Sequence, residues 1–235
     1  MDPRQFLRRY AYVYLYAAAF FLACAAFFRH SVEVSGALDP FSAHPVVVID
    51  AGHGGMDGGT TGVAGTAEDD VNLAISRRLN ALLLLCGCDT VMTRTNAESL
   101  STEGDTIRQQ KQSDLRNRVA LVNGLPSAVL VSIHQNHYPD SRYSGPQVFW
   151  SSGGEDLAGA VQRALNTVLA PGNKRTVKQA SGVYLMEHIT HPGILVECGF
   201  LSNPNEEQKL RAGDYQKQLA AVLTAAIVSY LHTPL

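Results

Sequence analysis

Three short apolar runs in this chain each lead into a residue that can bind a metal ion or move a proton. The runs are residues 46–50, just before His53, residues 129–134, ending in His134, and residues 193–197, ending in Glu197. β-Branched residues dominate them and Gly, Pro or Asn bound them, which predicts short buried strands. Glu68 opens a helical pattern soon after the first run. If the strands are parallel, the four side chains meet at the carboxyl edge of one sheet, where open α/β folds build their sites.

Strand-like runs alternate with helical patterns along most of the chain. Strands are predicted at 46–50, 89–94, 128–134, 147–150 and 193–197, with a weaker candidate at 183–186. Helical patterns start at Glu68 and stop at Gly87, and they recur at 105–123, 156–169 and 214–231. This alternation predicts one α/β domain with a mainly parallel sheet covered by helices on both faces.

The N-terminus predicts export. Arg4, Arg8 and Arg9 precede an uncharged apolar run from Tyr10 to Phe28, which as a helix would be about 28 Å long, close to a bilayer core. The arginines put the N-terminus in the cytoplasm and the rest of the chain outside. A cleavable signal peptide, processed near residues 35–37, is the alternative, but the run is long for one. We therefore expect a transmembrane anchor or signal segment at 1–30, a linker at 31–44 and a catalytic domain at 45–233.

The charge balance argues against nucleic acid as a partner. The chain has a formal net charge of −2, and four of its arginines lie in the first 30 residues, so the remainder is more acidic still. Proteins that bind the phosphate backbone usually present a basic face.

The loop at residues 51–60 is dense in glycine and holds His53. A phosphate-binding loop is one interpretation, but no Lys-Ser/Thr pair follows and the spacing does not match a dinucleotide fingerprint. From spacing alone, His53 is equally well explained as a ligand or as a packed residue. Likewise, Glu68 alone could be a first-turn acid that complements the helix dipole.

His134 ends an otherwise apolar run, so a buried imidazole there must be hydrogen-bonded or bound to a metal. With His53 and Glu68 it would complete two histidines and one carboxylate with one position open, a common catalytic zinc set. Zinc in such a set lowers the pKa of bound water toward ~7. Glu197 could then take up the proton and pass it to the departing amine.

Further polar residues lie near the predicted edge. Asp50 and Asn136 are candidates for orienting the imidazoles. Arg94 and Arg118 could pair with acids on the sheet edge or contact an anionic substrate. Three other histidines could line the cleft, although surface positions explain them better: His137, His188 and His191.

Several motifs resemble those of zinc-dependent N-acetylmuramoyl-L-alanine amidases, in the same order, over about residues 46–231. They are 48–55 (VIDAGHGG), 68–73 (EDDVNL), 93–94 (TR), Arg118 with Asn123, 132–136 (SIHQN) and 195–203 (LVECGFLSN). The resemblance implies one Zn²⁺ held by His53, Glu68 and His134, with Glu197 as the catalytic acid/base. It also implies a peptidoglycan substrate and a single α/β domain with a mixed sheet of about six strands.

The chain is most similar to the sporulation subgroup that trims spore-cortex peptidoglycan, because it couples a single domain to an N-terminal anchor. It departs from the family at Ala51, where proline is usual, with little expected effect on zinc because Ala can adopt the same φ. A vegetative autolysin, a zinc carboxypeptidase acting on stem peptides and an inactive wall-binding regulator are the alternatives. The sequence leaves open whether an activating protein partner exists.

Overall fold

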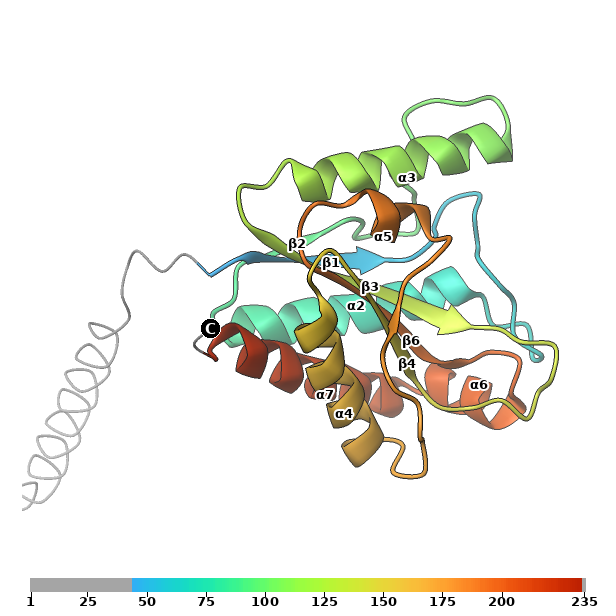
Figure 1. The fold of residues 1–235 in the computed structure, drawn as a ribbon. Helices are drawn as coiled ribbons and strands as arrows, with labels where there is room; N and C mark the ends of the chain where they lie inside the picture. The colour runs from blue at the N-terminus through green and yellow to red at the C-terminus, as the bar shows by residue number, and fades with distance from the viewer. Residues whose placement is uncertain (1–43, 234–235) are drawn as a thin grey trace, which may run out of the picture. The chain divides into compact units, whose positions relative to one another are not determined.

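The three apolar runs form the central strands of a six-stranded sheet. The computed structural model describes residues 44–233, in which β1 (Val46–Ala51), β3 (Ala128–Asn136) and β6 (Gly193–Phe200) lie side by side (Figure 1). Almost every residue of these strands is buried. Their β-branched, uniformly apolar sequences suit strands covered on both faces.

The sheet is mixed and mostly parallel, as predicted. Its strand order is β2-β1-β3-β6-β4-β5, with the shorter strands β2 (Thr90–Met92), β4 (Gln147–Ser151) and β5 (Lys178–Gln179) towards the edges. The four strands β1, β2, β3 and β6 are parallel, whereas β4 is antiparallel to β6 and β5 runs parallel to β4. The carboxyl ends of β1, β3 and β6 therefore share one edge, which is the edge on which the predicted site depends.

Helices cover both faces of the sheet (Figure 1). One face carries α2 (Glu68–Leu85), α4 (Glu155–Val168) and α7 (Gly213–Leu231). The opposite face carries α3 (Ile107–Asn123) and the short α5 (Tyr184–His188). Apolar side chains of alternate strand positions fill the two cores, and burying each large aliphatic side chain contributes about 1.5–3 kcal/mol.

Local signals fix the helix ends that matter for the site. The first turn of α2 contains three acidic residues, which complement the helix dipole, and Gly87 follows its end with a φ of +80°. At α3, Thr106 and Gln109 form a capping box. The start of α2, which carries Glu68, and the start of α3 are therefore set by their own sequences.

The weaker strand prediction at 183–186 is wrong. These residues lead into and form helix α5, in which Leu185 and Met186 turn into the core. The sixth strand is instead β5, whose two side chains are both exposed and carry no apolar signal. Helix α6 (Pro204–Arg211) was not predicted, because only Leu210 gives it a buried apolar side chain.

The predicted anchor and nearly all of the predicted linker lie outside the described residues. Among residues 44–233, no helix has the length and apolar character needed to span a membrane.

The helix α2 supplies a direct test of this packing. Leu79 of α2 is fully buried in the core, whereas Leu85, about one and a half turns later, is 83% exposed. We expect Leu79→Ala to lower the free energy of unfolding by about 2–5 kcal/mol, because it removes buried methyl groups and leaves a cavity. Leu85→Ala should change it by less than about 0.5 kcal/mol. Urea unfolding of both variants checks this, and equal losses would contradict the assigned packing.

Candidate metal centre and active site

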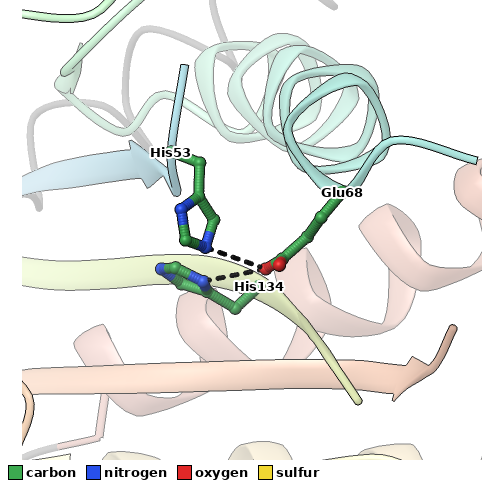
Figure 2. Close-up of side chains that lie close together, drawn as sticks. All are labelled: His53, Glu68 and His134. Carbon is green, nitrogen blue, oxygen red and sulfur yellow. Dashed lines mark hydrogen bonds and ion pairs between the residues drawn. The ribbon is translucent and has the colours of Figure 1, made fainter. Parts of the chain in front are cut away.

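His53, Glu68 and His134 converge at the carboxyl edge of the sheet (Figure 2). One ligand atom from each lies within 4.8 Å of the other two. Oε1 of Glu68 is 3.3 Å from Nε2 of His53 and 3.0 Å from Nδ1 of His134. The three side chains come from the loop after β1, the first residue of α2 and the end of β3, as the order of strands and helices predicts.

Glycines make room for these three side chains. A Cβ at Gly52 would lie 2.3 Å from Nε2 of His134, and one at Gly59 would lie 2.6 Å from Oε2 of Glu68. His53 itself has a φ of +62°, a left-handed conformation that is uncommon for residues other than glycine. The glycines of this loop therefore allow the side chains of His134 and Glu68 to lie close to the loop backbone.

Glu68 is buried and its carboxylate is held from several sides. Oε2 accepts a hydrogen bond from the Thr60 N–H at 2.9 Å, and Oε1 accepts from the Gln135 N–H at 3.1 Å. Burial raises the pKa of this carboxyl, but the hydrogen bonds and charges of His134 and His53 outweigh burial and hold the pKa well below its usual range. Glu68 is therefore ionised and held in an orientation from which it could bind a metal ion.

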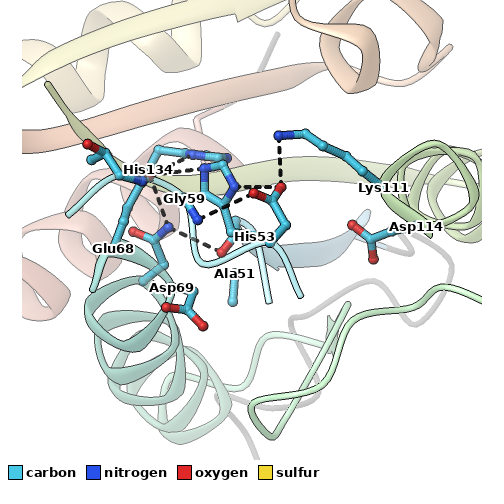
Figure 3. Close-up of polar contacts among 12 residues, drawn as sticks. Ala51, His53, Gly59, Glu68, Asp69, Lys111, Asp114 and His134 are labelled. Carbon is cyan, nitrogen blue, oxygen red and sulfur yellow. Dashed lines mark hydrogen bonds and ion pairs between the residues drawn. The ribbon is translucent and has the colours of Figure 1, made fainter. Parts of the chain in front are cut away.

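Asp57 orients His53, a role that the sequence did not reveal. Its Oδ2 lies 2.9 Å from Nδ1 of His53, and Nζ of Lys111 lies 2.9 Å from the same oxygen. Figure 3 shows His53 and Lys111 on the same side of the site, each joined to its partners by dashed lines. Burial lowers the pKa of His53, but Asp57 and Glu68 overcome this and raise it to about 9. Because Nδ1 faces Asp57, Nε2 is the nitrogen that remains for a metal.

The predicted role of Asp50 and Asn136 in orienting the imidazoles is not what the structure shows. Asp50 accepts hydrogen bonds from Thr93 at 2.9 Å, from Ser132 at 2.6 Å and from Arg118. Among the described residues, no hydrogen bond joins the Asn136 side chain to either imidazole. Asp50 supports the site indirectly, because its partner Arg118 also binds the backbone that leads to His53.

The two buried arginines fasten the backbone that carries His53. Arg118 pairs with Asp50 and Asp114, and it also donates to the carbonyls of Ala51 at 2.8 Å and His53 at 2.7 Å. Arg94 donates to the carbonyl of Ala51 at 2.9 Å and to the carbonyl of Gly52 at 3.0 Å. Both side chains are almost fully buried. The prediction that they pair with acids is right for Arg118, and neither is free to meet a substrate.

Glu197 lies beside His134, because the two residues are paired in register on neighbouring parallel strands. Its Oε2 atom is buried and has no hydrogen-bond partner among the described residues. Burial raises the pKa of the carboxyl to about 7, and the charge of Glu68 acts in the same direction. A carboxyl group with a pKa near neutrality can both accept and donate a proton, which is what a general acid/base requires.

The three other candidate histidines stay apart from this cluster. His137 and His188 are exposed, and His188 stacks on Tyr184. His191 is partly buried and lies 2.9 Å from the Leu125 carbonyl oxygen. Of the histidines in residues 44–233, only His53 and His134 join the group that could hold a metal.

The fold and this His-Glu-His group define a hydrolase-like α/β domain, and the comparisons identify its family. The family model for N-acetylmuramoyl-L-alanine amidases matches residues 47–229. The chain belongs to this family, and its reaction is hydrolysis of the amide bond between N-acetylmuramic acid and L-alanine in peptidoglycan. The predicted family and enzyme class are confirmed.

Particular relatives cover most of the chain. It is 33% identical over 217 residues to the germination-specific N-acetylmuramoyl-L-alanine amidase of Bacillus subtilis, covering 89% of this chain and 91% of that protein. Its fold is similar to that of the CwlD amidase from Clostridioides difficile, solved in complex with the GerS lipoprotein, with 34% identity, a TM-score of 0.76, and 80% and 98% of the two chains covered. An amidase structure from Clostridium difficile 630 has 31% identity, a TM-score of 0.71 and covers 82% and 99% of the chains.

The ion pair between Arg118 and Asp50 generates a stability prediction. Arg118→Leu should lower the free energy of unfolding by about 3–5 kcal/mol, because it leaves a buried carboxylate without its partner. The double variant Arg118→Leu/Asp50→Asn should recover part of this loss. Lys217→Leu, which breaks an exposed pair with Asp214, is the control and should cost less than about 1 kcal/mol. Denaturant unfolding measures all three, and a small loss in Arg118→Leu would refute the assigned role.

Proposed function

We propose that this amidase uses one zinc ion held by Nε2 of His53, Oε1 of Glu68 and Nδ1 of His134. The chemistry of the donors fits, because two imidazoles and one carboxylate with an open position form a common catalytic zinc set. The spacing also fits, since the separations of 3.0 and 3.3 Å are close to those between ligands about 2.0–2.1 Å from a tetrahedral ion. Glycines at 52 and 59 keep this space clear.

When bound, zinc would supply Lewis-acid polarisation of the scissile amide carbonyl and of a water molecule. Glu197 would accept the proton of the attacking water at its unpaired Oε2 atom and deliver it to the nitrogen of the departing L-alanine. Asp57 contacts Nδ1 of His53 and leaves Nε2 for the metal, so this ligand is already oriented and need not reorganise during the reaction. The unpartnered, buried oxygen of Glu197 is the single observation that most supports its assignment as acid/base.

The proposed setting is the spore cortex, on the extracytoplasmic side of the membrane. The germination-specific relative of Bacillus subtilis supports this setting, as does the basic and apolar N-terminal sequence proposed as an anchor at residues 1–30. The solved complex of the CwlD relative with a lipoprotein supports a protein partner for this chain. A vegetative wall substrate is the alternative, and digestion of cortex and vegetative sacculi in parallel distinguishes the two.

The role of Glu197 has a direct test. Glu197→Gln keeps the shape of the side chain but cannot take up a proton, so we expect kcat to fall by about 10²–10⁴-fold with zinc still bound. When the unsubstituted chain digests peptidoglycan, mass analysis of the muropeptides should find a free lactyl carboxyl and intact peptides. Glu155→Gln, an exposed change at the start of α4, is the control. A zinc-loaded Glu197→Gln protein that works at the normal rate would exclude the proposed role.

The orientation of His53 by Asp57 predicts an effect on metal affinity. Asp57→Asn should weaken zinc binding about tenfold and Asp57→Ala up to about a hundredfold, because the imidazole loses the anionic partner that fixes its ring. Competition with a chromophoric chelator measures the affinity independently of turnover. Asp105→Asn, an exposed loop substitution, should bind zinc normally, and unchanged affinity in Asp57→Ala would show that Asp57 is dispensable.

A further inference from the structure

A groove of about 1070 Å³ opens at the same edge of the sheet as the metal centre. It lies between the loop joining β3 to β4, the loop after α4 and helix α6. Residues that line it include Tyr143, Asn173, Lys174, Arg175 and Lys209. None of these residues belongs to the metal centre or to its supporting hydrogen bonds, so the groove is a separate surface feature.

The groove begins a short distance from the catalytic residues. Phe200 is paired with Asn136 across β3 and β6, so it lies three residues beyond Glu197 and opposite the end of β3. The guanidinium of Arg175 lies 5.0 Å from the ring centroid of Phe200 and 5.9 Å from that of Tyr143. At about 3.3 Å per strand residue, Phe200 lies on the order of 10 Å along β6 from Glu197. Arg175 and Tyr143, which line the groove, lie beside Phe200.

The charge available in the groove is positive. Lys174 and Lys209 are exposed, and neither forms an ion pair with any residue in the described part of the chain. The two acids of the groove already have partners. Asp140 pairs with Arg142, and Glu206 accepts the N–H groups of Gly145 and Phe200 at 2.9 and 2.8 Å. In an otherwise acidic domain, this arrangement favours an anionic ligand.

The loop that carries Arg175 and Lys174 is fastened to its neighbours. Asn166 donates to the Arg175 carbonyl at 3.0 Å, and the Arg175 N–H donates to Asn173 at 3.2 Å. Asn173 in turn donates to the Pro146 carbonyl at 2.8 Å. The backbone of this loop is therefore held in place before a ligand binds, and only the side chains of the cations have to be ordered.

We propose that this groove binds the terminal carboxylate of the stem peptide, an inference that rests on the proposed function. The peptide is joined to the glycan through the amino group of its L-alanine, so its opposite end is a carboxylate. An extended peptide spans about 3.3–3.6 Å per residue, and three or four residues therefore reach from the scissile amide into the groove. Arg175, Lys174 and Lys209 supply the charge that receives the carboxylate, and the groove thus selects uncapped peptides.

The test compares two soluble substrates, a muramoyl tetrapeptide with a free terminal carboxylate and the same compound with a terminal amide. For the full-length chain we expect KM to be about tenfold lower with the free carboxylate. Lys174→Glu/Lys209→Glu should raise KM for that substrate about tenfold at unchanged kcat and leave the amide substrate unaffected. Arg108→Glu/Arg163→Glu makes the same change of charge at two exposed cations outside the groove and should behave as the unsubstituted chain.

Each contrary outcome has a distinct meaning. If the unsubstituted chain releases peptide from neither substrate, the proposed function itself fails. If it cleaves both with the same KM, or if the groove variant matches the control variant, only the groove assignment is overturned. Equal losses on both substrates would also overturn it, because the effect would not depend on the carboxylate. A far-ultraviolet circular dichroism melt confirms that both double variants are folded.

Discussion

The buried contact between Arg118 and Asp50 is the interaction on which the site depends. It joins helix α3 to the end of β1, and the same guanidinium donates to the carbonyls of Ala51 and His53. Burial raises the pKa of Asp50, but Arg118 and Ser132 reverse this and hold the pKa below its usual range. A permanent charge at this depth is tolerated because each carboxylate oxygen of Asp50 and each guanidinium nitrogen of Arg118 has a hydrogen-bond partner. These charged contacts, together with packing, hold the end of β1 and the backbone of His53 in place.

Most of the fold and the four central site residues could be predicted from the sequence. Apolar runs of limited length identify buried strands, and alternation with amphipathic helices implies parallel neighbours. Once β1, β3 and β6 are parallel, the positions of His53, His134 and Glu197 at strand ends place them together without further information. Glu68 follows because it opens the helix that returns from that edge. The pattern of apolar residues therefore predicts those site residues whose positions follow from the order of strands and helices.

The remainder depends on contacts that leave no periodic pattern. Asp57 is one of several acids near the site, and only the path of the glycine loop brings it to Nδ1 of His53. Helix α6 is largely polar because it packs through acids: Glu207 accepts the N–H groups of Ala64 and Thr66 from a distant loop. The edge strand β5 has two exposed residues and no apolar signal. None of these features follows from the pattern of apolar residues along the chain.

The left-handed backbone at His53 links the stability of its loop to metal binding. An L-residue in that conformation is strained, and the strain persists only while the surrounding contacts determine the loop. A metal bound to the imidazole would add to those contacts, so part of its binding energy would be spent on holding the loop rather than on affinity. The loop that carries His53 would therefore be more stable with the metal bound than without it.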